Sequence, residues 1–438
     1  MNALSRRHFL KAGVAAASLT LPISARAASA NGKLRTAHIG VGGMGLSDLR
    51  SLMTHPQVEV TALCDVDLKF LDTAAALRPE AKKYRDFREM IAELGDRIDA
   101  VVVSTPDHTH APAAMTALNA QKAVYCQKPL THDIYEARML RSTAEAKGLV
   151  TQMGIQIHSH QEYVRAKAMI QSGAIGKVSQ VYAWRSGDWG YDGGPFEKFE
   201  KPPETLDWNL WIGTAAERPY VPKVYHPAQW RRLIDFGTGT LGDMGVHIFD
   251  TPYGALELTN PVTVKVDCRP PTGIGHPTRM IVDYEFPGTK YTADKVRWTW
   301  MDGNAAPPKS DSVGLPPGID LPGAASLFVG EGGFLLLPHI AAAKLFPEDK
   351  FKDYKAPEIP GTNHYHDWVN ACLGGRETGA SFSYGGPLTE ALLLGLIASR
   401  FPGKTLNWDA TKLEVTNLPE ANEFLKRKYR SGFEVKGL

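Results

Sequence analysis

The stretch Leu34-Arg-Thr-Ala-His-Ile-Gly-Val-Gly-Gly-Met-Gly45 decides the fold of this chain. Its first eight residues, 34–41, have the apolar character of a short buried strand. Glycines at 40, 42 and 45 follow the spacing G-x-G-x-x-G, and residues 46–53 have a helical pattern. A strand, a glycine turn and a helix in this order predict the first unit of a parallel α/β sheet.

Each glycine of this turn has a physical role in such a unit. Gly40 permits the tight turn, Gly42 lets the backbone approach a pyrophosphate, and Gly45 allows the helix to pack closely on the strand. Gly43 and Met44 lie between them at the helix N-terminus, where free N–H groups favour phosphate. The turn therefore predicts a dinucleotide-binding site.

An acidic residue further along the chain favours NAD over NADP. Residues 58–63 have the pattern of a second strand, and Asp65 follows it, 20 residues after Gly45. A carboxylate there can accept hydrogen bonds from the adenosine ribose hydroxyls and repels a 2′-phosphate. Val66 and Asp67 follow, so no basic residue stands beside Asp65 in the sequence.

Strands and helices continue to alternate as far as Met153, which predicts a doubly wound parallel sheet. Ligands of such sheets lie beyond the carboxyl ends of the strands. Three segments should therefore meet in one crevice: the glycine turn, the Thr105-Pro106 loop after the strand at 100–103, and Gln127-Lys128-Pro129 after the strand at 123–126.

Three motifs resemble those of the Gfo/Idh/MocA oxidoreductases, the glucose–fructose oxidoreductase and inositol dehydrogenase family. Besides the glycine turn, they are Ser104–His110, Cys126–Leu130 and the glycine-rich segment Gly237–His247. The resemblance implies an α/β Rossmann domain (33–153) and a C-terminal α+β domain (154–438) with a large open, mostly antiparallel sheet. It also implies hydride transfer between a nicotinamide cofactor and a sugar or polyol, and a homo-oligomer, dimer or tetramer.

The chemistry needs a base for the hydroxyl proton and a group that stabilises the reacting oxygen. His247 is the best base candidate, because imidazole titrates near neutral pH. Asp243 lies four residues earlier, so on a helix both side chains would share a face and the carboxylate could orient the ring. Lys128 can hydrogen-bond the reacting oxygen. By resemblance, Lys128, Asp243 and His247 form the catalytic set and also contact the substrate.

The same resemblance places Thr105, Pro106 and His110 beside the cofactor, together with Gln127 and Lys128. The family motif is usually Glu-Lys-Pro, whereas this chain has glutamine at position 127. A glutamine keeps a hydrogen-bonding carbonyl but removes a negative charge beside the lysine, which leaves the ammonium easier to deprotonate.

An aromatic-rich region between residues 184 and 230 is a candidate sugar subsite, because aromatic faces stack on sugar rings. Polar partners for the hydroxyl groups occur among the aromatics. The substrate candidates here are Arg185, Trp189, His226, Trp230 and Arg231. The alternative is that these aromatics fill a core.

Composition excludes several other classes. The 438 residues carry a net charge of +2, without the basic excess of a nucleic-acid-binding protein. Four cysteines lie far apart, and His158 and His160 have no evident third ligand, so we expect no metal site. No segment after residue 30 has the length and hydrophobicity of a membrane span.

The first 27 residues have the three parts of a signal peptide. Ser5–Lys11 is basic and contains Arg6-Arg7, an apolar run covers 12–23, and Ala25-Arg26-Ala27 resembles a cleavage site. The paired arginines resemble a twin-arginine (Tat) signal, which exports folded proteins. We therefore expect a periplasmic or secreted protein. Loss of the four basic residues in 1–27 would change the net charge from +2 to about −2.

These observations favour an exported NAD-dependent oxidoreductase of a sugar, polyol or glycoside. Free NAD is not a normal periplasmic metabolite, so we expect the cofactor to be tightly bound. An alternative is a redox-neutral glycosidase that uses bound NAD for oxidation, elimination, hydration and reduction. A third possibility, a sugar-binding protein that keeps NAD as structure, is disfavoured by the intact Lys128, Asp243 and His247.

Overall fold

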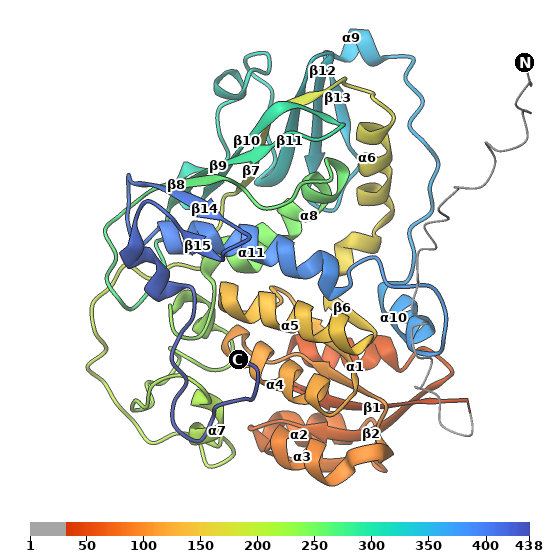
Figure 1. Ribbon diagram of the computed structural model, residues 1–438, viewed down its shortest axis with the longest axis vertical. Coiled ribbons are helices and arrows are strands. Elements are labelled where there is room, and N and C mark those ends of the chain that lie inside the picture. The colour runs from red at the N-terminus through yellow and green to blue at the C-terminus, as the bar shows by residue number, and fades with distance from the viewer. Residues whose placement is uncertain (1–31) are drawn as a thin grey trace, which may run out of the picture.

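The structure is a computed structural model, and it describes residues 32–438. The predicted signal peptide, 1–27, lies outside the described residues. The chain forms two sheets, one in the N-terminal third and one in the remainder, with helices between them (Figure 1).

The N-terminal sheet has six parallel strands in the order β3-β2-β1-β4-β5-β6, as in a Rossmann fold. Its strands are β1 Leu34–Ile39, β2 Val58–Cys64, β3 Lys82–Tyr84, β4 Ala100–Val103, β5 Ala123–Gln127 and β6 Thr151–Gly154. The helices between them are α1 Met44–Leu52, α2 Leu68–Ala75, α3 Phe87–Leu94, α4 Asp107–Asn119 and α5 Ile134–Lys147.

The second sheet has nine strands in the order β13-β12-β11-β7-β10-β9-β8-β14-β15, and only the β7–β10 pair is parallel. Its strands are β7 Val178–Arg185, β8 Thr263–Cys268, β9 Met280–Pro287, β10 Thr292–Asp302, β11 Ala324–Gly330, β12 Gly333–Pro338, β13 Lys344–Phe346, β14 Thr405–Asp409 and β15 Glu414–Val415. The remaining helices are α6 Gln161–Gln171, α7 Trp208–Ile212, α8 Val246–Ala255, α9 Glu348–Phe351, α10 His364–Cys372 and α11 Phe382–Ala398. The expected fold class, a Rossmann domain plus a domain with a mostly antiparallel sheet, is confirmed.

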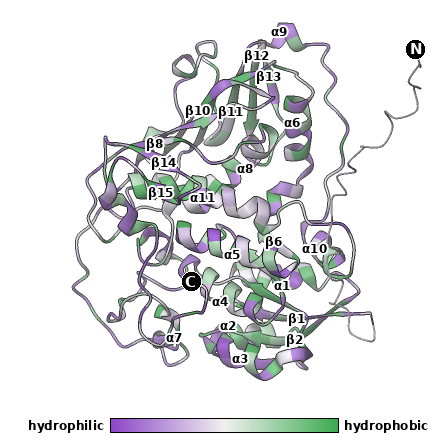
Figure 2. Ribbon diagram, in the orientation of Figure 1, coloured by the Kyte–Doolittle hydropathy of each residue, from purple (hydrophilic) through white to green (hydrophobic). Residues whose placement is uncertain are grey.

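Hydrophobic patterning explains both layers. All four residues of β4, Ala-Val-Val-Val, are buried, as expected for a parallel strand covered on both faces. The second sheet instead alternates, as in β9, where every other residue is buried. Figure 2 shows hydrophobic residues on the strands of both sheets. Helices α5 and α11 pack against each other and join the two domains.

Helix α4 begins at Asp107, directly after the Thr105-Pro106 loop, so His108 and His110 of the Ser104–His110 motif are buried helix residues. Strands β11 to β15 were not anticipated, since β12 and β13 are short and follow a Pro- and Gly-rich loop. Among residues 32–438, no helix combines the length and apolar character needed to cross a bilayer.

Candidate active site

A cleft with a cavity volume of about 500 Å³ lies at the carboxyl ends of the Rossmann strands. The predicted crevice residues surround it. The Rossmann domain contributes to its wall the glycine turn, Asp65, Thr105, Pro106, His110, Gln127 and Lys128. The second domain contributes His226, Trp230 and Arg231. The cleft thus collects most of the predicted cofactor and substrate residues.

The glycine turn has the shape that a dinucleotide requires. Gly40 has φ of 77°, in the left-handed region that favours glycine, and a Cβ there would lie 2.7 Å from the Ser104 carbonyl oxygen. A Cβ on Gly45 would overlap the Gly40 carbonyl, which confirms the need for close helix–strand packing. At Gly42 the ring of Phe70 occupies the space of a side chain. The residues therefore fit NAD, with Phe70 bordering the turn.

Asp65 directly follows β2, and its carboxylate contacts the backbone of the glycine turn. Its carboxylate accepts hydrogen bonds from Val41 N–H (2.8 Å) and Asp67 N–H (2.9 Å). Burial raises the pKa of Asp65, although these two bonds oppose the shift. The fold also brings Arg85 to this end of the cleft, where its guanidinium donates to the Val66 carbonyl (2.8 Å). The sequence alone indicated no basic residue here.

His226, which the sequence suggested as a substrate residue, lines the cleft near the end of β2, whereas Lys128 lines it near the end of β5. Its Nε2 is 3.0 Å from the Asp67 carboxylate, and its ring lies 5.2 Å from that of Phe70. Asp67 follows β2, whereas Lys128 follows β5, three strands away in the sheet. Three strand spacings amount to roughly 14 Å. The loop that carries His226 crosses the cleft, a path that sequence spacing did not indicate.

His110 joins two of the loops that border the cleft. Its Nδ1 lies 2.8 Å from the Pro129 carbonyl oxygen, and its Nε2 lies 2.8 Å from the Thr105 carbonyl oxygen. Burial lowers the pKa of His110. His110 therefore lies between the loop after β4 and the Lys128-Pro129 loop after β5, where its single N–H can donate to one of the two carbonyl oxygens.

Lys128 and Asp243 meet across the two domains. The Lys128 ammonium donates to Asp243 Oδ1 at 2.8 Å and to the Asp243 carbonyl at 2.9 Å, and Arg231 Nε lies 3.2 Å from Oδ1. Burial alone would raise the pKa of Asp243, but Lys128 and Arg231 lower it well below its usual range. The carboxylate is therefore charged and holds two cations at the β5 end of the cleft.

His247 does not pair with Asp243, in contrast to the predicted helical pair. Asp243 lies in one π-helical turn, residues 241–245, that runs directly into α8, and its carboxylate is taken by Lys128 and Arg231. Two cations bind a carboxylate more strongly than a neutral imidazole does. Burial and Lys128 lower the pKa of His247 well below 6.5, and its buried Nδ1 has no partner within residues 32–438.

Gln127 binds a buried acid that the sequence did not reveal. Its Nε2 donates to both carboxylate oxygens of Asp48, at 2.8 and 3.1 Å, and its Oε1 accepts from Lys128 N–H at 3.2 Å. Ser104 and Tyr365 also donate to Asp48. Asp48 is fully buried, and burial raises its pKa. A carboxylate therefore does lie near Lys128, but it belongs to Asp48 and contacts Gln127 and not Lys128 itself.

The aromatic region divides between packing and the cleft. Trp211, Tyr220, Tyr225 and Trp230 belong to a separate buried apolar cluster, against which Trp208 packs, as the core interpretation predicted. Trp211 and Trp230 of this cluster also line the cleft. The Arg231 guanidinium lies 4.3 Å from the Trp230 ring centre and 5.6 Å from that of Trp189. Arg185 lies at the end of β7.

The two histidines considered as a metal pair have other partners. His158 Nδ1 lies 2.9 Å from the Asp250 carboxylate, and His160 caps α6 by accepting from Glu162 N–H. In residues 32–438, no group of three or more candidate side chains is arranged to hold a metal ion.

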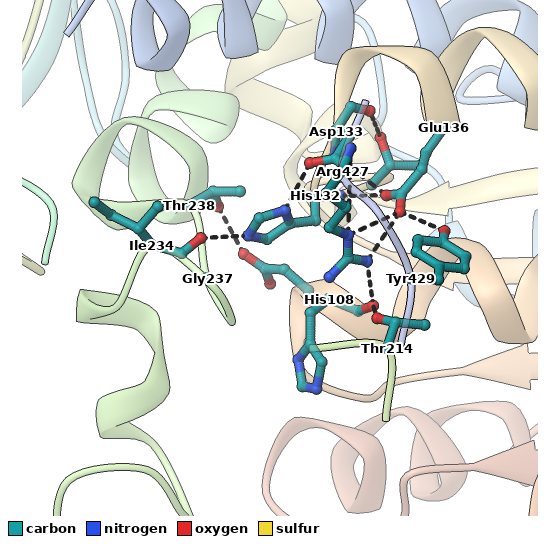
Figure 3. A network of polar contacts seen from close by, with 12 residues as sticks. His108, His132, Asp133, Glu136, Thr214, Ile234, Gly237, Thr238, Arg427 and Tyr429 are labelled. Carbon is teal, nitrogen blue, oxygen red and sulfur yellow. Dashed lines mark hydrogen bonds and ion pairs between the residues drawn. The ribbon is translucent and has the colours of Figure 1, made fainter. Parts of the chain in front are cut away.

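The C-terminal tail, residues 426–438, contributes to the cleft although no sequence signal pointed to it. Phe433 and Val435 line the cavity, and the Phe433 ring lies against the guanidinium of Arg88, another lining residue. Arg427 anchors the tail: its guanidinium donates to Glu136 (2.9 Å) and to the His108 carbonyl (2.6 Å), and Tyr429 donates to Glu136 (2.6 Å) (Figure 3). The tail is thus tied to α4 and α5 before it reaches the cofactor cleft.

Comparison with protein families supports this arrangement. Residues 34–155 match the Gfo/Idh/MocA model described as an oxidoreductase family, NAD-binding Rossmann fold. Residues 162–289 match the model described as an oxidoreductase family, C-terminal alpha/beta domain. The two matches together cover more than half of the chain.

Curated relatives are similar over part of their length. The inositol 2-dehydrogenase of Salmonella paratyphi B is 31% identical over 152 residues, which are 34% of this chain and 45% of the relative. A glycosyl hydrolase family 109 protein of Stenotrophomonas maltophilia is 28% identical over 242 residues, 53% of this chain and 50% of the relative. The chain spans about half the length of the curated relatives it matches.

Solved structures share the fold over most of the chain. The WlbA dehydrogenase from Bordetella pertussis, solved in complex with NADH and UDP-GlcNAcA, superposes with a TM-score of 0.61 at 15% identity. The match covers 86% of this chain and 99% of that one. At this identity the likeness concerns the fold alone.

Proposed function

The chain belongs to the Gfo/Idh/MocA family of NAD-binding oxidoreductases, and we propose that it transfers hydride between a carbohydrate alcohol and bound NAD. The observation that carries the proposal is the Lys128–Asp243–Arg231 cluster, in which Lys128 and Arg231 line the cofactor cleft and Lys128 is near enough to lower the pKa of the buried His247. Inositol, other polyols, sugars and glycosides are all alcohols of this class.

NAD, when bound, accepts the hydride of a carbon that carries a hydroxyl group. Lys128 is placed to donate a hydrogen bond to the reacting oxygen and to stabilise its developing negative charge. Asp243 holds the ammonium in position through the 2.8 Å ion pair. His247, kept neutral by burial and Lys128, accepts the hydroxyl proton.

We propose that the cofactor is NAD and that it is tightly held. The Asp65 carboxylate disfavours a 2′-phosphate, and Arg85 already donates to the Val66 carbonyl. Phe433 and Val435 close one wall of the cleft, so release of the dinucleotide requires the tail to move. Tight retention suits a protein exported in folded form, which the signal-like residues 1–27 support. A dimer or tetramer is the expected assembly.

A second candidate is a redox-neutral glycosidase, supported by the similarity to a glycosyl hydrolase family 109 protein over half of each chain. Oxidation of a ring carbon acidifies the neighbouring C–H bond. A base removes that proton, a C=C bond forms, and the C–O bond to the aglycone breaks. Water then adds to the C=C bond, and return of the hydride restores the alcohol.

One experiment separates the two candidates. The protein is purified without added NAD, and part of it is denatured to identify any released nucleotide. The remainder is mixed with free sugars, polyols and aryl glycosides while absorbance at 340 nm and aglycone release are recorded. Stoichiometric reduction without aglycone release supports the dehydrogenase. Aglycone release without net reduction supports the glycosidase.

Lys128→Ala tests the role of the lysine in either reaction. We expect a loss of at least about 10³-fold in the rate, because the developing charge loses its donor. The variant should keep its bound nucleotide, measured after denaturation, and Lys167→Ala on α6 serves as a matched control. Unchanged turnover of Lys128→Ala would contradict the assignment.

A further inference from the structure

Three residues form a row across neighbouring strands of the second sheet. Arg185 at the end of β7 pairs with Ala324 of β11, and His339, just beyond β12, donates its N–H to the Ala324 carbonyl at 2.9 Å. Ala183 and Leu337, two residues earlier on their strands, lie in the core beneath the helices. Because side chains alternate along a strand, Arg185 and His339 project to that same face, which α8 covers. Ala324 leaves room between them.

His339 is held in one orientation by Tyr163 of α6. The Tyr163 hydroxyl lies 2.6 Å from His339 Nδ1 and accepts a hydrogen bond from Ile340 N–H at 3.1 Å. Burial raises the pKa of Tyr163 to about 12, so the phenol keeps its proton. That proton is donated to Nδ1, and a neutral His339 therefore carries its own proton on Nε2.

Backbone strain accompanies this contact. Ile340 has φ of 59°, in the left-handed region, where a β-branched residue is rare. Its side chain is 57% exposed, so burial of the isoleucine does not compensate for the strain. Strained residues concentrate at functional sites, and here the turn directs His339 toward Tyr163.

Neither donor has a partner within residues 32–438. Within this range the Arg185 guanidinium forms no ion pair or hydrogen bond, and His339 Nε2 forms no hydrogen bond. His339 Nε2 is also not among the fully buried atoms that lack a partner, so it is at least partly accessible. Asp302, the neighbour of Arg185 on β10, instead accepts from Met280 N–H (2.6 Å) and from the Trp300 indole (3.0 Å). The Arg185 guanidinium and His339 Nε2 are thus two donors, on the same face of the sheet, without a hydrogen-bond partner in residues 32–438.

These donors lie beside the proposed reaction centre. The ring of His339 is 5.9 Å from that of His247. Burial, Arg185 and Lys128 all lower the pKa of His339. Lys128, Arg185 and Arg231 bring three positive charges to the region, and the Asp243 carboxylate pairs with two of them. Burial raises the pKa of Asp302, the strand neighbour of Arg185, to about 7, so this carboxyl group offsets little of the charge on Arg185 below neutral pH. The remaining positive charge favours an anion.

We propose that Arg185 and His339 form an anion-recognising subsite, which selects a substrate whose sugar carries a carboxylate or a phosphate group near the reacting carbon. The proposal rests on the proposed function, since it names the substrate class of the same site. Tyr163 acts as a positioning residue that fixes the donor nitrogen of His339.

The test compares neutral and anionic forms of the same sugars on the purified protein with its bound cofactor. Glucose, galactose and mannose are each compared with their uronic acid and their 6-phosphate. Dissociation constants come from calorimetry, and cofactor reduction is followed at 340 nm. We expect one anionic form to be favoured about 10- to 100-fold over its neutral counterpart. The preferred anion identifies carboxylate or phosphate as the source.

Variants test whether Arg185 and His339 cause this preference for an anionic sugar. Arg185→Met should remove the preference, because it weakens binding of the anionic sugar about 10- to 100-fold more than binding of the neutral one. Tyr163→Phe should reduce the preference without a change for the neutral sugar. Arg297→Met, on the exposed face of β10, is the matched control and should behave as the unmodified chain.

Failure of the subsite and failure of the proposed function give different results. Equal use of neutral and anionic sugars, or a preference that survives Arg185→Met, overturns the subsite and leaves the hydride-transfer function intact. Absence of bound nucleotide, with no reduction by any sugar, contradicts the proposed function itself.

Discussion

Gln127 and Asp48 form the most informative single contact in the candidate site. The glutamine amide donates to both carboxylate oxygens of a fully buried acid, and the same side chain accepts from Lys128 N–H. A glutamate at position 127 would face Asp48 carboxylate to carboxylate. The amide is therefore required by its neighbour, which explains the departure from the usual family motif.

Gln127→Glu should destabilise the protein by about 1–3 kcal/mol at pH 7, because two buried carboxylates cannot both be charged at this distance. Their shared proton raises a carboxyl pKa in the folded state, so the loss grows as the pH rises from 5 to 8. Denaturant unfolding at several pH values measures it. The double variant Asp48→Asn/Gln127→Glu restores an amide–carboxylate pair and should recover most of the loss. Equal stability of the single variant at all pH values would contradict this account.

His247 should supply a base whose activity is insensitive to mild acid. Its pKa lies well below the ordinary 6.5, so the imidazole stays neutral between pH 8 and pH 6. We expect the single-turnover rate of cofactor reduction to change by less than about two-fold over this range. An ordinary histidine would lose about three quarters of its neutral form at pH 6. A midpoint near pH 6.5 in the rate profile would contradict the lowered pKa of His247. The His247→Gln variant should reduce the cofactor slowly at every pH.

At the scale of elements, the C-terminal tail is the segment whose role only the fold reveals. Arg427 and Tyr429 tie it to Glu136 of α5, and Arg430 donates to the Gly213 carbonyl at 3.0 Å. Beyond these anchors, the Phe433 ring lies between two guanidinium groups, 4.5 Å from that of Arg88 and 4.3 Å from that of Arg430. Arg88, which lines the cleft, also donates to the Gly432 carbonyl at 2.7 Å, so the end of the chain is held against the cleft wall.

Truncation after Ser431 should speed the release of NAD by about ten-fold, because the anchors remain while one wall of the cleft is removed. Dissociation is followed by displacement of bound nucleotide with excess fluorescent analogue. The melting temperature should fall by a few degrees, because Val435 and Leu438 lose their packing on the core, but the protein should remain folded. Phe433→Ala should show part of the effect, and Phe199→Ala, at an aromatic residue that is 56% exposed and outside the cleft, should show none. Equal retention in the truncated protein would rule out a role for the tail.

At the scale of the whole molecule, the site is a contact between two domains. Lys128 comes from the Rossmann sheet, whereas Asp243 and Arg231 come from the second domain. Helices α5 and α11 pack against each other between the same two domains. We expect a substitution that weakens this packing to slow hydride transfer more than it weakens cofactor binding.

Export concerns the full chain, including the residues that precede the described ones. The proposal of a twin-arginine signal predicts that the Arg6→Lys/Arg7→Lys variant stays in the cytoplasm of a bacterial host, because this route selects for the arginine pair. Fractionation and immunoblotting measure the distribution, and N-terminal sequencing of the exported form should begin near Ala28. Lys11→Arg is the control. Undiminished export of the double variant would show that another signal is used.

Several features followed from the sequence by itself because local chemistry decides them. The glycine spacing, the acid after β2 and the alternation of strands and helices predicted the Rossmann sheet, since each depends on residues within about 30 positions. The resemblance of the motifs extended this prediction to the second sheet. It also identified Lys128 and Asp243, which the fold brings to 2.8 Å.

Only the tertiary structure decided which side chains meet across the domains. Arg231 takes the carboxylate expected to orient His247, His226 crosses to the cofactor side, and Asp48 supplies the charge behind Gln127. The tail reaches the cleft from more than 300 residues away, where Arg427 donates to the His108 carbonyl. Such contacts depend on how domains pack and loops return, and no periodicity within a segment carries that information.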